Sequence, residues 1–202
     1  MKTIILTGPI GGGKSAVSAL LAKRGIPVYD SDARTKRLYD IYPGLVTELE
    51  SALEMSLRTS EGKLDRGLLA SVIFADDAAR ETVESIVYPA VLKDFIGWRD
   101  EQEAPFVVLE SAVILYKPVF DGIADAVVLV TAPEQLRLGR VMARDGASEA
   151  DIRRRMAAQE VPEDKADVVI INAGTPDELN AAVERSFFGK NSYICKLLKQ
   201  AE

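Results

Sequence analysis

The residues best suited to chemistry stand at the start of the chain. Residues 8–15 read Gly-Pro-Ile-Gly-Gly-Gly-Lys-Ser, which fits the phosphate-loop pattern G-x-x-x-x-G-K-[ST]. In this pattern the glycines let successive backbone N–H groups curl around phosphates, and the following helix presents its positive N-terminal end to them. Lys14 is expected to reach the β- and γ-phosphates, and the Ser15 hydroxyl to be a ligand of Mg²⁺. The sequence therefore predicts a nucleoside triphosphate site.

The neighbouring sequence supplies the elements that this loop needs. Residues 3–7 form a short apolar run typical of a strand, and residues 16–23 read as a helix closed by Gly25. A glycine-rich turn that binds nothing is the alternative, and the strand–loop–helix setting argues against it. We expect the nucleotide to contact Gly11, Gly12, Gly13, Lys14, Ser15 and Ala16.

Five apolar, mostly β-branched runs predict the strands of one sheet. They are continuously hydrophobic rather than alternating, which is typical of a parallel sheet covered on both faces. Helical stretches separate them, so the predicted fold class is α/β, a doubly wound sandwich with a five-stranded parallel sheet. The runs are residues 3–7, 27–29, 106–109, 126–130 and 168–171. Two sequences, beginning at Thr131 and Thr175, fit a capping box with proline in the first helical turn.

An unusually long interval separates the second and third strands. Residues 33–104 contain amphipathic helical patterns, for example at residues 66–74. An excursion of this length beside a phosphate loop is the natural place for a second substrate, and a purely structural insertion is the alternative. Arg66 is a candidate for binding that substrate's phosphates, with a surface ion pair as its alternative.

Carboxylates follow two of the predicted strands. Asp30 and Asp32 come after the second strand, and in an extended chain side chains two residues apart point the same way. One of them could accept a proton from an attacking hydroxyl, and solvated turn or capping aspartates are the alternative. Glu110, at the end of the third strand, resembles the acid that holds Mg²⁺ in phosphate-loop enzymes; otherwise it marks the strand end.

Arginines gather after the fourth strand. Phosphoryl transfer spreads negative charge over the γ-phosphate oxygens, and arginines that close over them stabilise that charge. Because acidic residues are interleaved, an ion-paired surface helix is the alternative. A flexible turn at residues 145–148 separates two helical patterns and favours a movable lid. The arginines are Arg137, Arg140, Arg144, Arg153, Arg154 and Arg155.

Composition narrows the class of protein. The 202 residues are 48% hydrophobic and 28% charged, which is ordinary for a soluble domain, and the net charge of −6 argues against broad nucleic-acid contact. The chain has no histidine and one cysteine, so acid–base chemistry falls to carboxylates, lysine or tyrosine. No apolar segment is long enough for a membrane span or a signal peptide. We therefore expect a cytoplasmic protein without a membrane or nucleic-acid partner.

Taken together, these motifs resemble the dephospho-coenzyme A kinase family over nearly the full chain. The selective stretches are residues 25–32, 155–159 and 166–174. The resemblance implies that ATP, with Mg²⁺, phosphorylates the ribose 3′-hydroxyl of dephospho-coenzyme A, which is the last step of coenzyme A synthesis. It also implies that Asp32 is the general base and that Arg140 is the lid arginine near the phosphates.

The resemblance further divides the chain into functional parts. It implies a phosphate-loop kinase core of residues 1–32, 104–136 and 165–202. It also implies a helical coenzyme-A-binding insertion at residues 33–103 and a helical lid at residues 137–164.

The sequence departs from the family's usual pattern at three places. Tyr88 stands where the family usually has histidine, and residues 112–116 replace a Pro-Leu-Leu run that ends in an acid. Ala16 stands where the loop usually ends in threonine. The first two departures concern the expected acceptor pocket. They motivate one alternative, a catalytically weakened nucleotide-binding module. The other alternative is a different small-molecule kinase, such as a nucleoside monophosphate kinase, with the same machinery and another acceptor.

Overall fold

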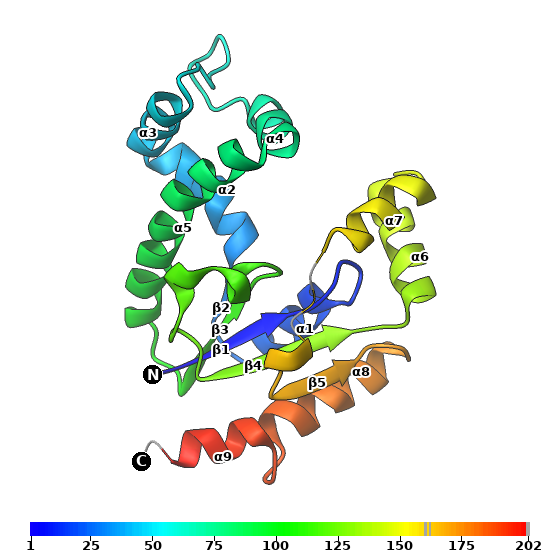
Figure 1. Ribbon diagram of the computed structural model, residues 1–202. Coiled ribbons are helices and arrows are strands. Elements are labelled where there is room, and N and C mark those ends of the chain that lie inside the picture. The colour runs from blue at the N-terminus through cyan, green and yellow to red at the C-terminus, as the bar shows by residue number, and fades with distance from the viewer. Residues whose placement is uncertain (160, 162, 201–202) are drawn as a thin grey trace. The chain divides into compact units, whose positions relative to one another are not determined.

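The computed structural model describes residues 1–159, 161 and 163–200. The chain forms two compact units, one made of residues 1–30 with the chain from residue 102 onward, the other of residues 31–101. The second unit spans nearly the residues of the predicted insertion. Figure 1 shows the first unit as a sheet with helices and the second as a group of helices drawn in blue through green. Residues 160 and 162 of the predicted lid and residues 201–202 of the predicted core lie outside the described residues.

The first unit is built on a five-stranded parallel sheet in the order β2-β3-β1-β4-β5, which confirms the predicted α/β class. Each strand lies within one residue of its predicted bounds, because buried, continuously apolar runs have few alternatives to a central strand. The strands are β1 (Lys2–Thr7), β2 (Val28–Asp30), β3 (Phe106–Glu110), β4 (Ala126–Thr131) and β5 (Val168–Ile171).

Helices of the first unit follow the strands in the chain. They are α1 (Lys14–Ala22), α6 (Glu134–Asp145), α7 (Glu149–Ala157), α8 (Pro176–Val183) and α9 (Tyr193–Lys199). Shorter helical turns are Ile114–Tyr116, Pro118–Phe120, Glu163–Lys165 and Glu184–Phe188. In the described part of the chain no helix is long and apolar enough to cross a membrane.

The main core of this unit fixes helix α1 against the sheet. Val17 and Leu21 of α1 are fully buried in one apolar cluster with side chains of β1, β3 and β4 and with Val183 of α8. Burying such a side chain contributes about 1.5–3 kcal/mol relative to leaving it exposed. The segment between β1 and α1 is therefore held at both ends by the core.

The predicted capping box at Thr131 is wrong, whereas the one at Thr175 is confirmed. Thr131 remains in β4, where it pairs with Ile171 of β5, and α6 begins at Glu134 after an N-cap proline with no side-chain cap. Thr175 accepts from the backbone of Glu178, whose carboxylate accepts from the Thr175 N–H in return. Strand pairing therefore overrode the local capping signal at Thr131.

The second unit contains four helices in its described residues. They are α2 (Ser31–Ile41), α3 (Pro43–Leu53), α4 (Arg66–Ala75) and α5 (Asp77–Asp100). The long helix α5 contacts each of the other three and buries Val83, Val87, Val91 and Phe95. Asp65 begins α4 by accepting a hydrogen bond from the backbone N–H of Leu68.

Candidate active site

The glycine loop lies between β1 and α1, and its backbone leaves no room for side chains. Gly8 has φ of 147°, and a Cβ there would lie 2.0 Å from the Val130 carbonyl oxygen. Gly13 has φ of 104°, and a Cβ there would lie 2.0 Å from Nδ2 of Asn172. Both the angle and the space therefore require glycine. The loop packs against the ends of β4 and β5, as expected for a phosphate site at the carboxyl edge of a parallel sheet.

Lys14 and Ser15 occupy the first turn of α1, as the motif predicts. The Lys14 ammonium donates to the Gly8 carbonyl oxygen at 2.8 Å, so its side chain curls back over the loop. Ala16 follows as an exposed residue, and its N–H donates to the Gly13 carbonyl at 3.1 Å. The helix N-terminus and the lysine thus direct their positive charge toward the loop.

The two predicted magnesium ligands, Ser15 and Glu110, lie next to each other. Glu110 pairs with Leu6 in the sheet register and is only 8% exposed. The Ser15 hydroxyl donates to Oε1 of Glu110 at 3.1 Å, and the Ser18 hydroxyl donates to Oε2. Ser18 was missed by the sequence reasoning, although it stands three positions after Ser15 on the same helix face.

This donor set fits Mg²⁺. Among the described residues no group of three or more His, Cys, Asp or Glu side chains is placed to hold a metal ion. Mg²⁺ in phosphate-transfer sites is usually bound by one or two protein oxygens together with phosphate oxygens and water. The hydroxyl of Ser15 and the carboxylate of Glu110 supply such hard oxygen ligands.

Arg140 reaches the glycine loop from α6. Its guanidinium donates to the Asn172 carbonyl oxygen at 3.0 Å and to the Gly11 carbonyl oxygen at 3.4 Å. The Asn172 side-chain amide in turn donates to the Gly12 carbonyl oxygen at 3.1 Å. Asn172 is a site residue that sequence reasoning missed; its position directly after β5, at the carboxyl edge of the sheet, was the available signal.

Four of the other predicted lid arginines form surface ion pairs, as the alternative reading held. Arg144 and Arg155 both bind Asp145 and lower its pKa to about 2 through their hydrogen bonds. Arg153 binds Glu134 and Glu149, and Arg154 binds Asp151. Arg137 is half-buried and donates to the Ala132 carbonyl oxygen at 3.0 Å. Arg137 lies against Gly11 through its backbone, whereas Arg140 brings its guanidinium to the loop.

The α6–α7 hairpin is anchored on the glycine loop. Ile10 packs against a small apolar cluster of Leu138, Val141 and Ile152. Gln159, just beyond α7, accepts a hydrogen bond from the Ile10 N–H at 2.7 Å and donates to the Gly8 carbonyl at 3.5 Å. The hairpin that was predicted to be a lid therefore contacts the nucleotide loop directly.

Asp32 lies in the first turn of α2, so the expectation of an extended Asp30–Asp32 pair is wrong. Strand β2 ends at Asp30 and the helix begins at Ser31, which places the two carboxylates on different elements. Both residues are exposed, and no shared face follows from their spacing. Helix replaces strand here because residues 31–41 include strong helix formers such as Ala33, Lys36 and Leu38, and Leu38 is buried.

Tyr88, one of the departures, lies near Asp32 in the helical unit. Its hydroxyl is 3.4 Å from Oε1 of Glu84, one turn earlier on α5. Burial raises the pKa of Tyr88, and the charges of Glu84 and Asp32 raise it further. The other departure, residues 112–116, includes a short helical turn with Ile114 buried and with Lys165 lying over the Tyr116 ring.

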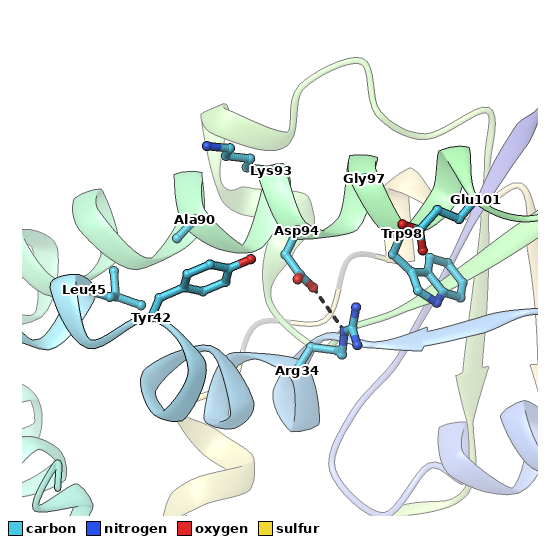
Figure 2. Close-up of a pocket in the computed structure, with 9 residues that line it drawn as sticks. All are labelled: Arg34, Tyr42, Leu45, Ala90, Lys93, Asp94, Gly97, Trp98 and Glu101. Carbon is cyan, nitrogen blue, oxygen red and sulfur yellow. Dashed lines mark hydrogen bonds and ion pairs between the residues drawn. The ribbon is translucent and has the colours of Figure 1, made fainter.

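Two cavities open on the helical unit. The first has a volume of about 400 Å³, is lined by Arg34, Tyr42, Asp94 and Trp98 among others, and contains the Arg34–Asp94 ion pair drawn in Figure 2. The second has a volume of about 730 Å³ and includes Arg66 in its lining. Arg66 donates to Asp40 at 2.9 Å and to the Lys36 carbonyl at 2.8 Å, which is the surface ion pair weighed as its alternative.

The glycine loop between β1 and α1, with Lys14 and Ser15 in the first turn of the helix, is the geometry of the phosphate-loop class of proteins. The comparison with known families assigns the chain more specifically. A family model described as Dephospho-CoA kinase matches residues 2–178, and the chain belongs to this family.

Individual relatives agree with this assignment. A Dephospho-CoA kinase of Porphyromonas gingivalis is 46% identical over 160 residues, covering 79% of this chain and 78% of that protein. A crystal structure from Thermus thermophilus superposes with a TM-score of 0.78 at 34% identity, covering 91% of this chain and 94% of that chain. Dephospho-CoA kinase from Campylobacter jejuni supports the fold alone, with a TM-score of 0.64, 21% identity and 100% coverage of both chains.

Proposed function

We propose that this chain transfers the γ-phosphoryl group of ATP to the ribose 3′-hydroxyl of dephospho-coenzyme A, giving coenzyme A and ADP. The observation that carries the proposal is the family match across residues 2–178 together with an intact phosphate loop. Membership of this family implies ATP as the phosphoryl donor and dephospho-coenzyme A as the acceptor.

The residues around the loop have separate roles in this reaction. Lys14 and Arg140 offset the negative charge that develops on the phosphate oxygens. Because these cations are already oriented before the reaction, the site does not have to reorganise during it. Ser15 and Glu110 would hold Mg²⁺, which when bound neutralises charge on the β- and γ-phosphate oxygens. Arg140 keeps guanidinium N–H groups beyond those used on Gly11 and Asn172, because the group carries five donors.

The acceptor is assigned to the helical unit. Asp32 orients the 3′-hydroxyl and accepts its proton, and its exposed position in the first turn of α2 keeps the carboxylate accessible. Arg66 binds phosphate groups of the acceptor by exchanging its partner Asp40 for a phosphate oxygen. The charge of Asp32 acts on Tyr88 and helps to raise its pKa, so we assign Tyr88 to the surroundings of the same ribose.

A panel of acceptors tests the proposal. ATP turnover is measured with dephospho-coenzyme A, with nucleoside monophosphates and with no acceptor, and a Lys14→Ala variant is assayed in parallel to expose contaminating kinases. We expect turnover with dephospho-coenzyme A that Lys14→Ala abolishes. Turnover only with a nucleoside monophosphate would assign a different kinase activity, and ATP binding without turnover would assign a nucleotide-binding module.

The reaction is placed in the cytoplasm. That compartment supplies ATP and keeps thiols reduced, which suits the single free thiol of Cys195.

A further inference from the structure

Helix α2 presents the two cavities of the helical unit on opposite faces. Tyr39 lines the larger cavity and Arg34 lines the smaller one. Asp32 and Tyr39 are seven positions apart, close to two turns of about 3.6 residues, so they share one face of the helix. Arg34 is two positions from Asp32, about 200° around the axis. The larger cavity therefore lies on the Asp32 face, about 10 Å along the helix.

The electrostatic influences on the tyrosines agree with this placement. The pKa of Tyr88 is raised by the nearby Asp32 and Tyr39 as well as by burial. Burial raises the pKa of Tyr39 to about 12, and the charge of Arg66, in the cavity lining, acts in the opposite direction. The charge of Asp32 thus acts on Tyr88 and that of Arg66 on Tyr39, which agrees with the helix geometry that puts Asp32 and the cavity on one face of α2.

The loop between α3 and α4 forms one wall of the larger cavity and is internally braced. Arg58 donates to Glu50 at 3.0 Å, to Thr47 at 2.9 Å and to the Gly62 carbonyl at 3.2 Å. The Glu50 carboxylate also accepts from the Leu57 N–H at 2.9 Å. The Arg58 guanidinium therefore uses its hydrogen bonds to stabilise this loop.

Lys63 is the cation of this wall that projects into solvent. Its side chain is 77% exposed, and its ammonium is 4.0 Å from the Glu61 carboxylate, a long separation for an ion pair. Of the two carboxylates that line the cavity, Asp65 caps α4 and Asp40 pairs with Arg66 of the same lining. The cavity therefore offers an anion the charge of Lys63 and, where the anion replaces Asp40, that of Arg66, beside apolar surface from Pro43, Val46 and Leu64.

We propose that this larger cavity binds the 5′ arm of the acceptor, with Lys63 on its diphosphate and the apolar wall on its pantetheine chain. The inference rests on the proposed function. Once the ribose 3′-hydroxyl is at Asp32, the 5′ substituent must leave along one side of α2. The Asp32 face leads to a cavity with cationic and apolar surface, which matches an arm that is anionic near the ribose and largely apolar beyond it.

The smaller cavity does not fit this role. It lies on the Arg34 face of the helix, away from Asp32, and its Arg34–Asp94 ion pair has side chains only 28% and 13% exposed, against 49% and 60% for Arg66–Asp40, so an anion replaces this carboxylate less readily. An exposed lysine, Lys93, is nevertheless among its lining residues, and Figure 2 shows the Lys93 side chain pointing away from Arg34 and Asp94. Lys93 is therefore a matched control for Lys63, because reversing either charge changes the net charge of the chain equally.

The experiment compares Lys63→Glu with Lys93→Glu. We expect Lys63→Glu to raise the KM for dephospho-coenzyme A about tenfold, with KM for ATP unchanged. Lys93→Glu should change neither value by more than about twofold. Adenosine, tested as an inhibitor competitive with the acceptor, should keep its Ki in Lys63→Glu, because it lacks the 5′ phosphates and the rest of the arm. Both lysines are exposed, and thermal unfolding checks that both variants remain folded.

The outcomes separate this inference from the proposed function. If the unaltered enzyme turns over dephospho-coenzyme A but both variants raise its KM equally, the placement of the arm is wrong. If the unaltered enzyme does not turn it over, the proposed function fails, and calorimetric binding of coenzyme A to the two variants still decides the placement. Equal affinities for Lys63→Glu and Lys93→Glu would then overturn it.

Discussion

Gln159 holds the backbone of Ile10 in the nucleotide loop, although the two residues are 149 positions apart in the sequence. Its side-chain oxygen accepts from the Ile10 N–H at 2.7 Å while its amide lies 3.5 Å from the Gly8 carbonyl. One side chain thus connects the end of α7 to two peptide groups of the loop. It couples the α6–α7 hairpin to the place where phosphates are expected.

We expect Gln159→Ala to raise the KM for ATP about fivefold to tenfold. The loop N–H of Ile10 loses its partner, which costs about 1–3 kcal/mol when no water replaces it. The measurement is the KM for ATP at saturating acceptor, with Arg154→Ala on the exposed side of α7 as the control. If both variants behave alike, Gln159 contributes nothing specific to the loop.

Asp32→Asn should lower turnover far more than it weakens ATP binding. The substitution keeps the shape of the side chain but removes the charge that accepts the proton, and general-base contributions are typically ~10²–10⁴-fold. Part of the loss would reflect positioning of the hydroxyl, since phosphoryl transfer can be largely dissociative. Single-turnover rates and ATP affinity are measured together. Wild-type turnover across neutral pH would exclude Asp32 as the base and make Asp30 the next candidate.

Arg140→Ala should both slow phosphoryl transfer and increase futile ATP hydrolysis. The arginine loses its contribution to charge stabilisation, on the order of 10²–10³-fold for one such donor. The substitution also removes the hydrogen bonds to Gly11 and Asn172 that hold α6 at the loop, which lets water reach the nucleotide. The ratio of ADP to coenzyme A formed measures this uncoupling. A ratio that stays at one in the variant contradicts the role of the hairpin as a lid.

Arg66→Ala should chiefly raise the KM for dephospho-coenzyme A. Its ion pair with Asp40 is on the surface, with side chains 49% and 60% exposed, so its loss changes stability little. Arg80→Ala, which breaks a comparable exposed pair with Asp77, is the control. An effect on the KM for ATP alone would remove the acceptor from this part of the helical unit.

Local sequence patterns predicted the elements of this fold better than the contacts between them. The strands and the Thr175 capping box depend on neighbouring residues, and both are confirmed. The capping box at Thr131 failed because pairing with Ile171 depends on a strand far along the chain.

The candidate site shows the same division. Lys14 and Ser15 could be placed from the loop motif because the motif is local. Ser18, Asn172 and Gln159 could not be assigned roles, because each acts on a residue at least 92 positions away. The sheet order, with β1 between β3 and β4, brings Ser18 and Asn172 to their partners, and the packing of the α6–α7 hairpin on Ile10 brings Gln159 to its own.

The position of Trp98 gives the chain an optical reporter of its own. It is the single tryptophan, and it lies in the smaller cavity on the Arg34 face, where neither substrate is assigned. Its fluorescence would therefore not be quenched by direct contact with nucleotide or acceptor. A change in emission when the acceptor is added would instead register a rearrangement of α5 against α2, and a constant emission would mean that these two helices bind the acceptor as a rigid pair.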